Sequence, residues 1–406
     1  MQLSLFNDLD DKILTDLFQA YFNARKNKRN TINALAFEHK FEDQIFSLFD
    51  DITNLIYQPR PCICFIVDKP VKREIFAADF RDRVIHHFIF NCISPLFEKL
   101  FINDCYSCRV GKGTHYGIRR LDHFIRSCSS NYSKDCHVLK LDISGYFMSM
   151  DRSLLFEKIK TGLDRYNSKI EFDLPILLYL IERTIFSDPT NHCRIKGKSS
   201  DWKNLPNDKS LFHSDPDCGL PIGNLTSQLF GNIYMSDFDH FIKRDLGIKC
   251  YGRYVDDFVL VHRDKAYLKS LIPVIREYLK TNLMLDLHPK KVYLQNSNKG
   301  VKYLGVVIKP HRIYIANRTK GNFFDAIQMQ NKVVKSNKPS QEDQEIFLSS
   351  MNSYLGILKH FKTYKLRKKM IFKNLSSWWW NYVHLTGKIG KFVVSHRPYR
   401  KRQLNS

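Results

Sequence analysis

The chain has 406 residues, of which 43% are hydrophobic, and a formal net charge of +23. This length and composition suit two or three folded subdomains and exclude a disordered chain, and the charge points to a polyanionic partner. No apolar run is long enough to span a membrane and the N-terminus lacks a secretory signal, so we expect a cytoplasmic protein without a membrane partner. The ten scattered cysteines predict reduced thiols rather than a zinc site.

The N-terminal part is predicted to be helical and then to form a basic hairpin. Apolar residues recur at helical spacing through residues 1–57. Strands are expected at 62–67 and 72–76, on either side of a short turn. This hairpin would place Lys72 and Arg73 where they can clamp the phosphates of a nucleotide. Arg73 is the better candidate, because its planar guanidinium grips phosphate oxygens in two places.

An amphipathic helix is predicted next, over residues 77–90, and it carries Arg81 and Arg83. A loop at 101–115, which contains Gly111 and Gly113, precedes a second helix at 116–127. Glycine permits close approach of another backbone, so this loop is a candidate for contact with a template strand.

Two mainly apolar segments that contain aspartates are predicted to be strands of one sheet. Residues 138–147 form a buried strand that carries Asp142, and residues 251–261 have the pattern of a β-hairpin with Asp256 and Asp257 at its tip. An isolated Asp-Asp pair is usually a solvated turn, but these flanks are too apolar for that. Asp142 and Asp256 at one point would offer the oxygen ligands that Mg²⁺ prefers, as two-metal phosphoryl transfer requires. Asp257 would support the site, because adjacent side chains on a strand point to opposite faces.

Two motifs in combination resemble those of the reverse transcriptases: Tyr-Val-Asp-Asp at 254–257, and the upstream strand that carries Asp142 and is followed by two aromatic residues. The resemblance extends from about residue 60 to about residue 375. Most members carry Gln-Gly where this chain has Ile222-Gly223. The Ile-Gly-Asn-x-x-Ser-Gln form resembles the enzymes of diversity-generating retroelements, as do the polar insertion at 188–218 and the segment 353–360. An apolar side chain in place of the amide removes a polar check on the nascent base pair, so low fidelity is expected.

The resemblance implies a catalytic set of Asp142, Asp256 and Asp257, with two Mg²⁺ ions, or Mn²⁺ in their place, held by these residues and Ile143. Phe147 matches the position of the ring that excludes a ribose 2′-hydroxyl. The implied nucleotide-binding residues are Lys72, Arg73, Tyr146, Phe147, Ile222 and Gly223. The implied template- and primer-binding residues are Arg81, Arg83, Asn224, Ser227, Gln228, Lys290 and Lys291.

The resemblance also implies a right-hand polymerase of the α/β (α+β) class. The expected parts are an N-terminal helical extension (1–57), fingers (58–137), a palm (138–310) with 151–218 returning to the fingers as an insertion, a helical thumb (316–385) and a basic tail (386–406). Residues 316–406 contain 18 Lys/Arg against four Asp/Glu, which suits a thumb along a hybrid duplex. Trp378, Trp379 and Trp380 are expected to pack in a core or at a partner surface.

The expected function is RNA-directed DNA synthesis from dNTPs on a template RNA, through an RNA/DNA hybrid, with error-prone copying in a diversity-generating retroelement. That family implies a small basic accessory protein as a partner. The alternatives are a reverse transcriptase of a retron or antiviral defence system, and a non-catalytic RNA-binding protein on a polymerase fold. The intact Asp142, Asp256 and Asp257 argue against the last alternative.

Overall fold

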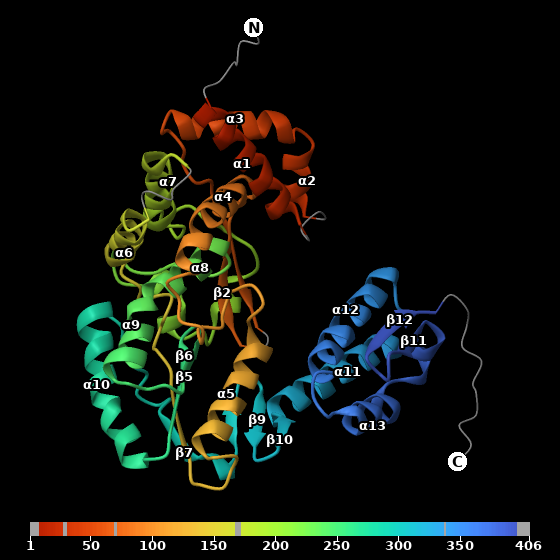
Figure 1. Cartoon of the computed structure of the whole chain (residues 1–406). Helices are drawn as coiled ribbons and strands as arrows, with labels where there is room; N and C mark the ends of the chain where they lie inside the picture. Colours follow the sequence, from red (N-terminus) through yellow and green to blue (C-terminus); the bar gives the residue numbers. More distant parts are fainter. Residues whose placement is uncertain (1–7, 27–30, 69–70, 167–171, 337, 396–406) are drawn as a thin grey trace. The chain divides into compact units, whose positions relative to one another are not determined.

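The computed structural model describes the chain except for residues 1–7, 27–30, 69–70, 167–171, 337 and 396–406 (Figure 1). The chain divides into two compact units, residues 1–128 with 137–294 and residues 129–136 with 295–406. Both units combine helices with mainly antiparallel sheets, which confirms the predicted α/β class. Among the described residues, no helix is long and apolar enough to cross a membrane.

The first unit begins with helices, as the sequence predicts for residues 1–57. Tyr21 lies at their centre, because its ring stacks on Phe41 with centroids 5.1 Å apart and meets Phe80 edge-on. The helices concerned are α1 (Asp8–Arg25), α2 (Ile32–Glu38), α3 (Phe41–Thr53) and α4 (Phe80–Phe97).

The predicted basic hairpin is present as β1 (Ile63–Val67) and β2 (Arg73–Ala77), which pair antiparallel. Part of the polar insertion at 188–218 joins the same sheet, because β4 (Arg194–Ile195) lies parallel to β1. After β4 the insertion forms three 3₁₀ turns, at Ser199–Trp202, Asn207–Lys209 and Leu211–His213. All ten cysteines are free thiols.

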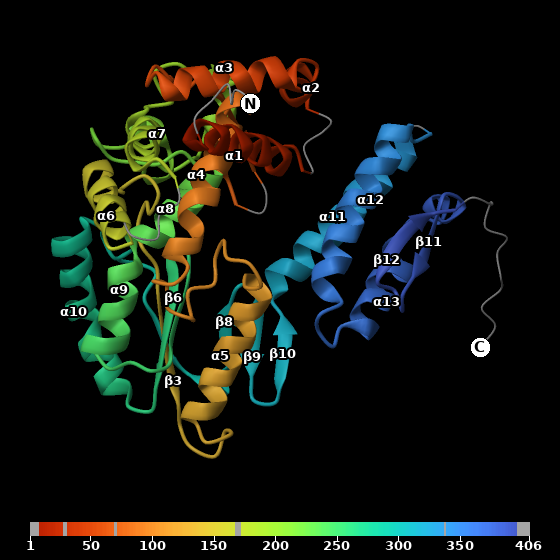
Figure 2. The ribbon, with the colours of Figure 1, turned by 45° about the horizontal axis from the view of Figure 1, so that its top comes forward.

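The central sheet of the first unit has the order β5-β6-β3, with β7 (Tyr293–Asn296) at its far edge. Alternation along the strands divides its two faces. Residues such as Leu141 and Phe258 lie in the main apolar core together with one flanking helix, α10. Another helix, α5, packs on β5 and β6, and the two helices lie on opposite sides of the sheet (Figures 1 and 2). The bounds are β3 (His137–Leu141), β5 (Tyr251–Tyr254), β6 (Asp257–His262), α5 (Thr114–Cys128) and α10 (Lys265–Leu283).

Helix α8 (Leu225–Tyr234) packs against α4, α6 and α9 and is almost entirely buried. Because α8 begins directly after the Ile222-Gly223-Asn224 block, its packing fixes where that block lies. The other elements are α6 (Arg152–Asp164), α7 (Leu174–Phe186), α9 (Ser236–His240) and a π-helical turn (Phe241–Asp245).

The second unit contains a small antiparallel sheet of order β10-β9-β8 and the helices expected over residues 316–385. Trp379 is fully buried and stacks on Phe347, with ring centroids 4.1 Å apart, so it packs in a core. The elements are β8 (Val301–Tyr303), β9 (Val306–Lys309), β10 (Arg312–Ile315), α11 (Asn317–Ser336), α12 (Gln341–Leu358), α13 (Tyr364–Asn374) and a 3₁₀ turn (Ser377–Asn381).

The basic tail begins later than the predicted residue 386. Strands β11 (Val383–Thr386) and β12 (Lys391–Val394) form a hairpin that packs on α12. Phe392 is buried there, and its backbone exchanges two hydrogen bonds with the Asn352 amide. Residues 383–394 are therefore folded against the helices, and residues 396–406 lie outside the described part of the chain.

Candidate active site

The three predicted carboxylates lie at one end of the central sheet. β3 ends at Leu141, which pairs with Phe258 of β6. The same register, continued by one residue, sets Asp142 opposite Asp257. Asp256 lies in the turn between β5 and β6, where Tyr254 pairs with Asp257. Residues more than a hundred positions apart in the sequence are therefore neighbours.

This turn has a strained backbone at Val255. A two-residue hairpin loop favours positive φ, which glycine adopts most easily, yet here the β-branched Val255 has a φ of 60°. Such a conformation costs about 1–3 kcal/mol and persists only where its surroundings enforce it. The Val255 amide donates to the Ser107 hydroxyl (3.2 Å), and the Val255 carbonyl accepts from the Arg253 guanidinium (3.0 Å). These bonds hold the acidic tip in place.

Arg253 in turn depends on a buried carboxylate. Its side chain forms a two-pronged contact with Asp239, at 2.8 and 2.6 Å, and neither side chain is exposed. Burial disfavours the charged guanidinium, but Asp239 more than offsets this and raises the pKa of Arg253. Sequence reasoning missed this pair and Ser107. The available signal was an arginine inside an otherwise apolar hairpin, which requires a buried partner.

The carboxylates of the tip hold their protons more strongly than usual. Burial raises the pKa of Asp256, and the negative charge of Asp142 raises it further. Burial also raises the pKa of Asp257 to about 6, although the Lys140 ammonium, 2.8 Å from its Oδ2, works against this. A second ammonium, that of Lys291, lies 2.7 Å from Oδ1 of Asp142.

This environment fits divalent cations. Oδ1 of Asp257 is buried and has no hydrogen-bond partner within the described part of the chain. The negative charge of Asp142 contributes to the raised pKa of Asp256, and a bound cation beside the two carboxylates would relieve this repulsion. Ile143 lies opposite Leu287 in a short antiparallel bridge. The Asp142 carbonyl accepts from the His288 amide and the Ser144 amide donates to the Asp286 carbonyl, so the carbonyl of Ile143 takes no part in these two hydrogen bonds. The predicted oxygen donors are thus close together and incompletely satisfied.

The two basic residues of the hairpin differ in their surroundings. Arg73 is exposed. Its positive charge partly opposes the rise in the pKa of Asp256, so Arg73 lies near enough to act on this carboxylate. Lys72 instead donates to the carbonyl of Lys203 (2.7 Å) and lies 3.5 Å from Asp68. The Arg73 guanidinium is therefore accessible, whereas the Lys72 ammonium already has two protein partners.

Tyr146 and Phe147 both lie against α8, but only the Phe147 ring is partly exposed. Tyr146 is 4% exposed, and its hydroxyl donates to the carbonyl of Gly231 (2.6 Å). This corrects the prediction that Tyr146 contacts a nucleotide, because burial removes it from the site. Phe147 is half-buried, and a side chain at Gly231 would come within 3.4 Å of its ring.

The Ile222-Gly223 segment lies directly against β2. The Phe76 amide donates to the Ile222 carbonyl (2.8 Å), and a Cβ on Gly223 would lie 2.8 Å from the Phe76 oxygen. Gly223 also has a φ of +129°, so both the approach and the conformation require glycine. The side chains of Ile222 and Phe147 pack on one apolar cluster, which consists of Cys62, Cys64, Phe76, Met148 and Leu211.

Several residues predicted to contact template or primer are instead structural. Arg81 is 3% exposed, forms an ion pair with Asp51 and lies over the Tyr57 ring, so it shapes the fold rather than facing a template. Asn224 and Ser227 are buried as well, because each accepts or donates a backbone hydrogen bond that fixes the start of α8.

The other residues predicted to contact template or primer are at least partly exposed, and two of them form contacts within the protein. Gln228 and Lys290 are exposed. Arg83 is half-buried, and its Nε donates to the Ala78 carbonyl (2.9 Å). Lys291, expected at a phosphate, contacts the Asp142 carboxylate in the structure.

The comparisons with known proteins agree with this architecture. A family model described as "Reverse transcriptase (RNA-dependent DNA polymerase)" matches residues 70–308, more than half of the chain. The chain therefore belongs to the reverse transcriptase family, whose members are RNA-directed DNA polymerases. Protein YkfC of Escherichia coli (strain K12) is 23% identical over 308 residues, covering 68% of this chain and 73% of YkfC.

Solved structures with a detectable likeness include two telomerases. The apo telomerase from Candida tropicalis, truncated from its C-terminal domain, is 13% identical with a TM-score of 0.44, over 64% of this chain and 56% of that one. The telomerase from Candida albicans in complex with a TWJ fragment of telomeric RNA is 11% identical with a TM-score of 0.46, over 79% of this chain and 57% of that one. The chain thus spans less than two thirds of either telomerase.

Proposed function

We propose that this protein synthesises DNA on an RNA template at the end of the central sheet. The observation that carries the proposal is the meeting of Asp142 with Asp256 and Asp257, two of which have raised pKa values. Two bound Mg²⁺ ions would activate the primer 3′-hydroxyl and stabilise the leaving pyrophosphate. Asp142 and Asp256 would hold them, with Asp257 and the carbonyl of Ile143 in support. A cation at Asp142 competes with Lys291 for the same oxygen.

The incoming dNTP would lie between β2 and the carboxylates. Arg73 is exposed on this side, and its guanidinium would grip the triphosphate. Phe147 would contact the sugar, where a 2′-hydroxyl would collide with its ring. In this assignment Tyr146 supports Phe147 from behind, through its bond to the Gly231 carbonyl. The central sheet would be the palm, the β1–β2 sheet part of the fingers, and helices α11 to α13 the thumb.

We further propose that copying is error-prone and serves a diversity-generating retroelement. Ile222 packs its apolar side chain on the same cluster as Phe147, the ring assigned to the sugar. An amide at residue 222 could hydrogen-bond the nascent pair and reject wrong geometries, but isoleucine cannot. A template RNA and a small basic accessory protein are the partners this role requires.

A fidelity measurement tests this role. Ile222→Gln should lower the misincorporation frequency in cDNA made on a defined RNA template, by about tenfold, because one hydrogen bond to the pair restores about 1–1.5 kcal/mol of discrimination. Ile222→Leu keeps an apolar side chain of the same size and serves as the matched control, with an unchanged frequency. Equal error rates in the wild type and Ile222→Gln would refute the fidelity role of residue 222.

A further inference from the structure

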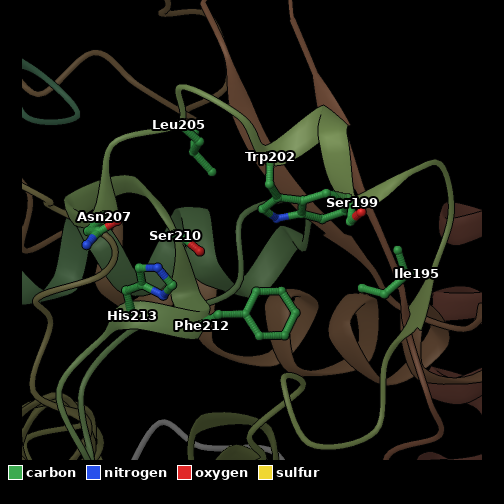
Figure 3. Close-up of a pocket in the computed structure, with 8 residues that line it drawn as sticks. All are labelled: Ile195, Ser199, Trp202, Leu205, Asn207, Ser210, Phe212 and His213. Carbon is green, nitrogen blue, oxygen red and sulfur yellow. The ribbon is translucent and has the colours of Figure 1, made fainter.

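The insertion between α7 and α8 encloses a cavity of about 430 Å³ that none of the assigned roles uses. Figure 3 shows the Trp202 and Phe212 rings turned toward this hollow, with Ile195 beside them. Although they are large and apolar, Phe212 is 40% exposed and Ile195 is 52% exposed. Apolar side chains that gather around an open cavity mark a binding site more often than a stable surface.

The walls of the cavity are fixed by a carboxylate beneath them. Glu74 of β2 is fully buried and accepts three hydrogen bonds from the insertion. The donors are the Trp202 indole (2.6 Å), the Ser210 hydroxyl (2.9 Å) and the Leu211 amide (2.7 Å). Because a completely satisfied buried carboxylate holds its partners firmly, the cavity is formed before any ligand arrives.

The segment that lines the cavity is basic, although its lysines and arginine lie beside the lining residues in the sequence and not among them. Residues 194–209 include five Lys/Arg against two Asp, and one of these acids, Asp201, already caps a 3₁₀ turn by accepting from the Lys198 amide (2.8 Å). Arg194, Lys196, Lys198 and Lys203 are exposed. Aromatic side chains at a cavity in a basic, exposed segment match a nucleic-acid strand, which presents a flat base and flanking phosphates.

The cavity also belongs to the same structural unit as the carboxylates. β4 pairs with β1 in the sheet that carries Arg73. The backbone of Asp208 lies against the turn after Asp142, since a Cβ on Gly145 would come within 2.9 Å of the Asp208 oxygen. A base held in the cavity would thus belong to a strand that approaches the active site.

We propose that this cavity binds one unpaired nucleobase of single-stranded RNA, stacked on the Phe212 ring beside Trp202, while the exposed lysines and arginine of the same segment contact the neighbouring phosphates. This rests on the proposed use of an RNA template and adds a subsite on its unpaired part. Asn207 and Ser199 at the cavity offer both donors and acceptors, so they can satisfy the edge of any base. Binding is therefore expected to require a base without selecting a particular one.

The test measures fluorescence anisotropy of the full chain with a labelled oligoadenylate RNA of about twelve nucleotides, and with the same backbone made abasic. Magnesium and dNTPs are omitted, so the result does not depend on catalysis. Phe212→Ala should weaken binding of the oligoadenylate about tenfold, the value of one base stacked on an aromatic ring, and leave binding of the abasic strand unchanged. Phe212→Leu keeps the apolar contact with Phe76 and should show the same loss, which separates stacking from packing.

Phe46→Ala, a change at a ring that is 43% exposed on α3, is the matched control and should bind both strands like the wild type. Unchanged affinity of Phe212→Ala for the oligoadenylate would overturn the proposal, as would an equal loss on the abasic strand. If Phe212→Ala instead keeps its RNA affinity and loses a partner protein, the cavity receives a protein side chain and the proposal is wrong. Failure of the wild type to extend a primer would count against the proposed function alone.

Discussion

Tyr146 and Phe147 are adjacent aromatic residues with different surroundings, and this difference decides which of them can contact a sugar. The resemblance implies that both bind the nucleotide and assigns the ring that excludes a ribose 2′-hydroxyl to Phe147. In the structure the Tyr146 hydroxyl is held by the Gly231 carbonyl, whereas Phe147 keeps a partly exposed ring. Burial, which depends on where α8 packs, separates the two roles.

Replacement of Phe147 by alanine should raise ribonucleotide incorporation relative to deoxyribonucleotide incorporation by about tenfold or more, since removing the collision lowers the barrier by at least about 1.4 kcal/mol. Single-nucleotide insertion kinetics with matched rNTP and dNTP pairs give this ratio. Tyr146→Phe removes only the hydroxyl and should leave the ratio unchanged. An unaltered ratio in Phe147→Ala would reduce this ring to core packing.

The pKa of Asp257, raised to about 6 chiefly by burial, predicts a pH-dependent metal site. Below that pH the carboxyl is protonated, and a cation must displace the proton, so apparent Mg²⁺ affinity should fall as the pH drops through 6 and stay level above it. Mg²⁺ should therefore raise the thermal unfolding midpoint at pH 7, should raise it much less at pH 5, and should lose this effect on chelation. Equal midpoint shifts at both values would contradict the assignment.

The strands of the β5–β6 hairpin were easy to predict from the sequence. The buried contacts that stabilise the hairpin were the hardest feature to predict. Alternating apolar residues around an acidic pair predict the strands and the tip. The pattern cannot predict the positive φ of Val255, because valine is the last residue expected there. Nor can it identify Asp239, since that residue reaches Arg253 only once α9 has packed against the sheet.

Loss of the buried pair under this hairpin should be severe. Arg253→Met leaves the Asp239 carboxylate buried without its counter-charge, which costs about 3–5 kcal/mol. The thermal midpoint of the first unit should fall sharply in calorimetry. Arg276→Met on the exposed face of α10 is the matched control, and its midpoint should stay within experimental error of the wild type. A similar midpoint for both variants would show that Arg253 is dispensable for the fold.

At the scale of the whole chain, sequence patterns predict the order of helices and strands in both units, because long periodic segments are strong signals. The insertion at 188–218 is the main exception. Its polar, turn-rich composition predicts a loop, yet Glu74 collects Trp202, Ser210 and Leu211 into an ordered structure. A single buried acid on a distant strand leaves no periodic trace in the sequence, so this organisation could not be predicted.

The excess charge is also a property of the whole chain. Residues 316–406 contribute a net +14 of the total +23, and the described part of this region is mainly helical. Positive charge spread over helices suits contact with the phosphates of a duplex or a folded RNA, and binding should then weaken steeply with salt. An accessory protein that is itself basic would bind away from this surface or through the RNA.

Primer extension on an RNA template with Mg²⁺ and dNTPs, comparing the wild type with Asp256→Asn, shows whether these carboxylates carry catalysis. The asparagine keeps the size of the side chain and removes its charge, so extension should fall by several orders of magnitude while the protein stays folded. Asp237→Asn removes an exposed carboxylate that pairs with Lys158 and should extend like the wild type. Near-normal extension by Asp256→Asn would contradict the assignment of catalysis to this end of the sheet.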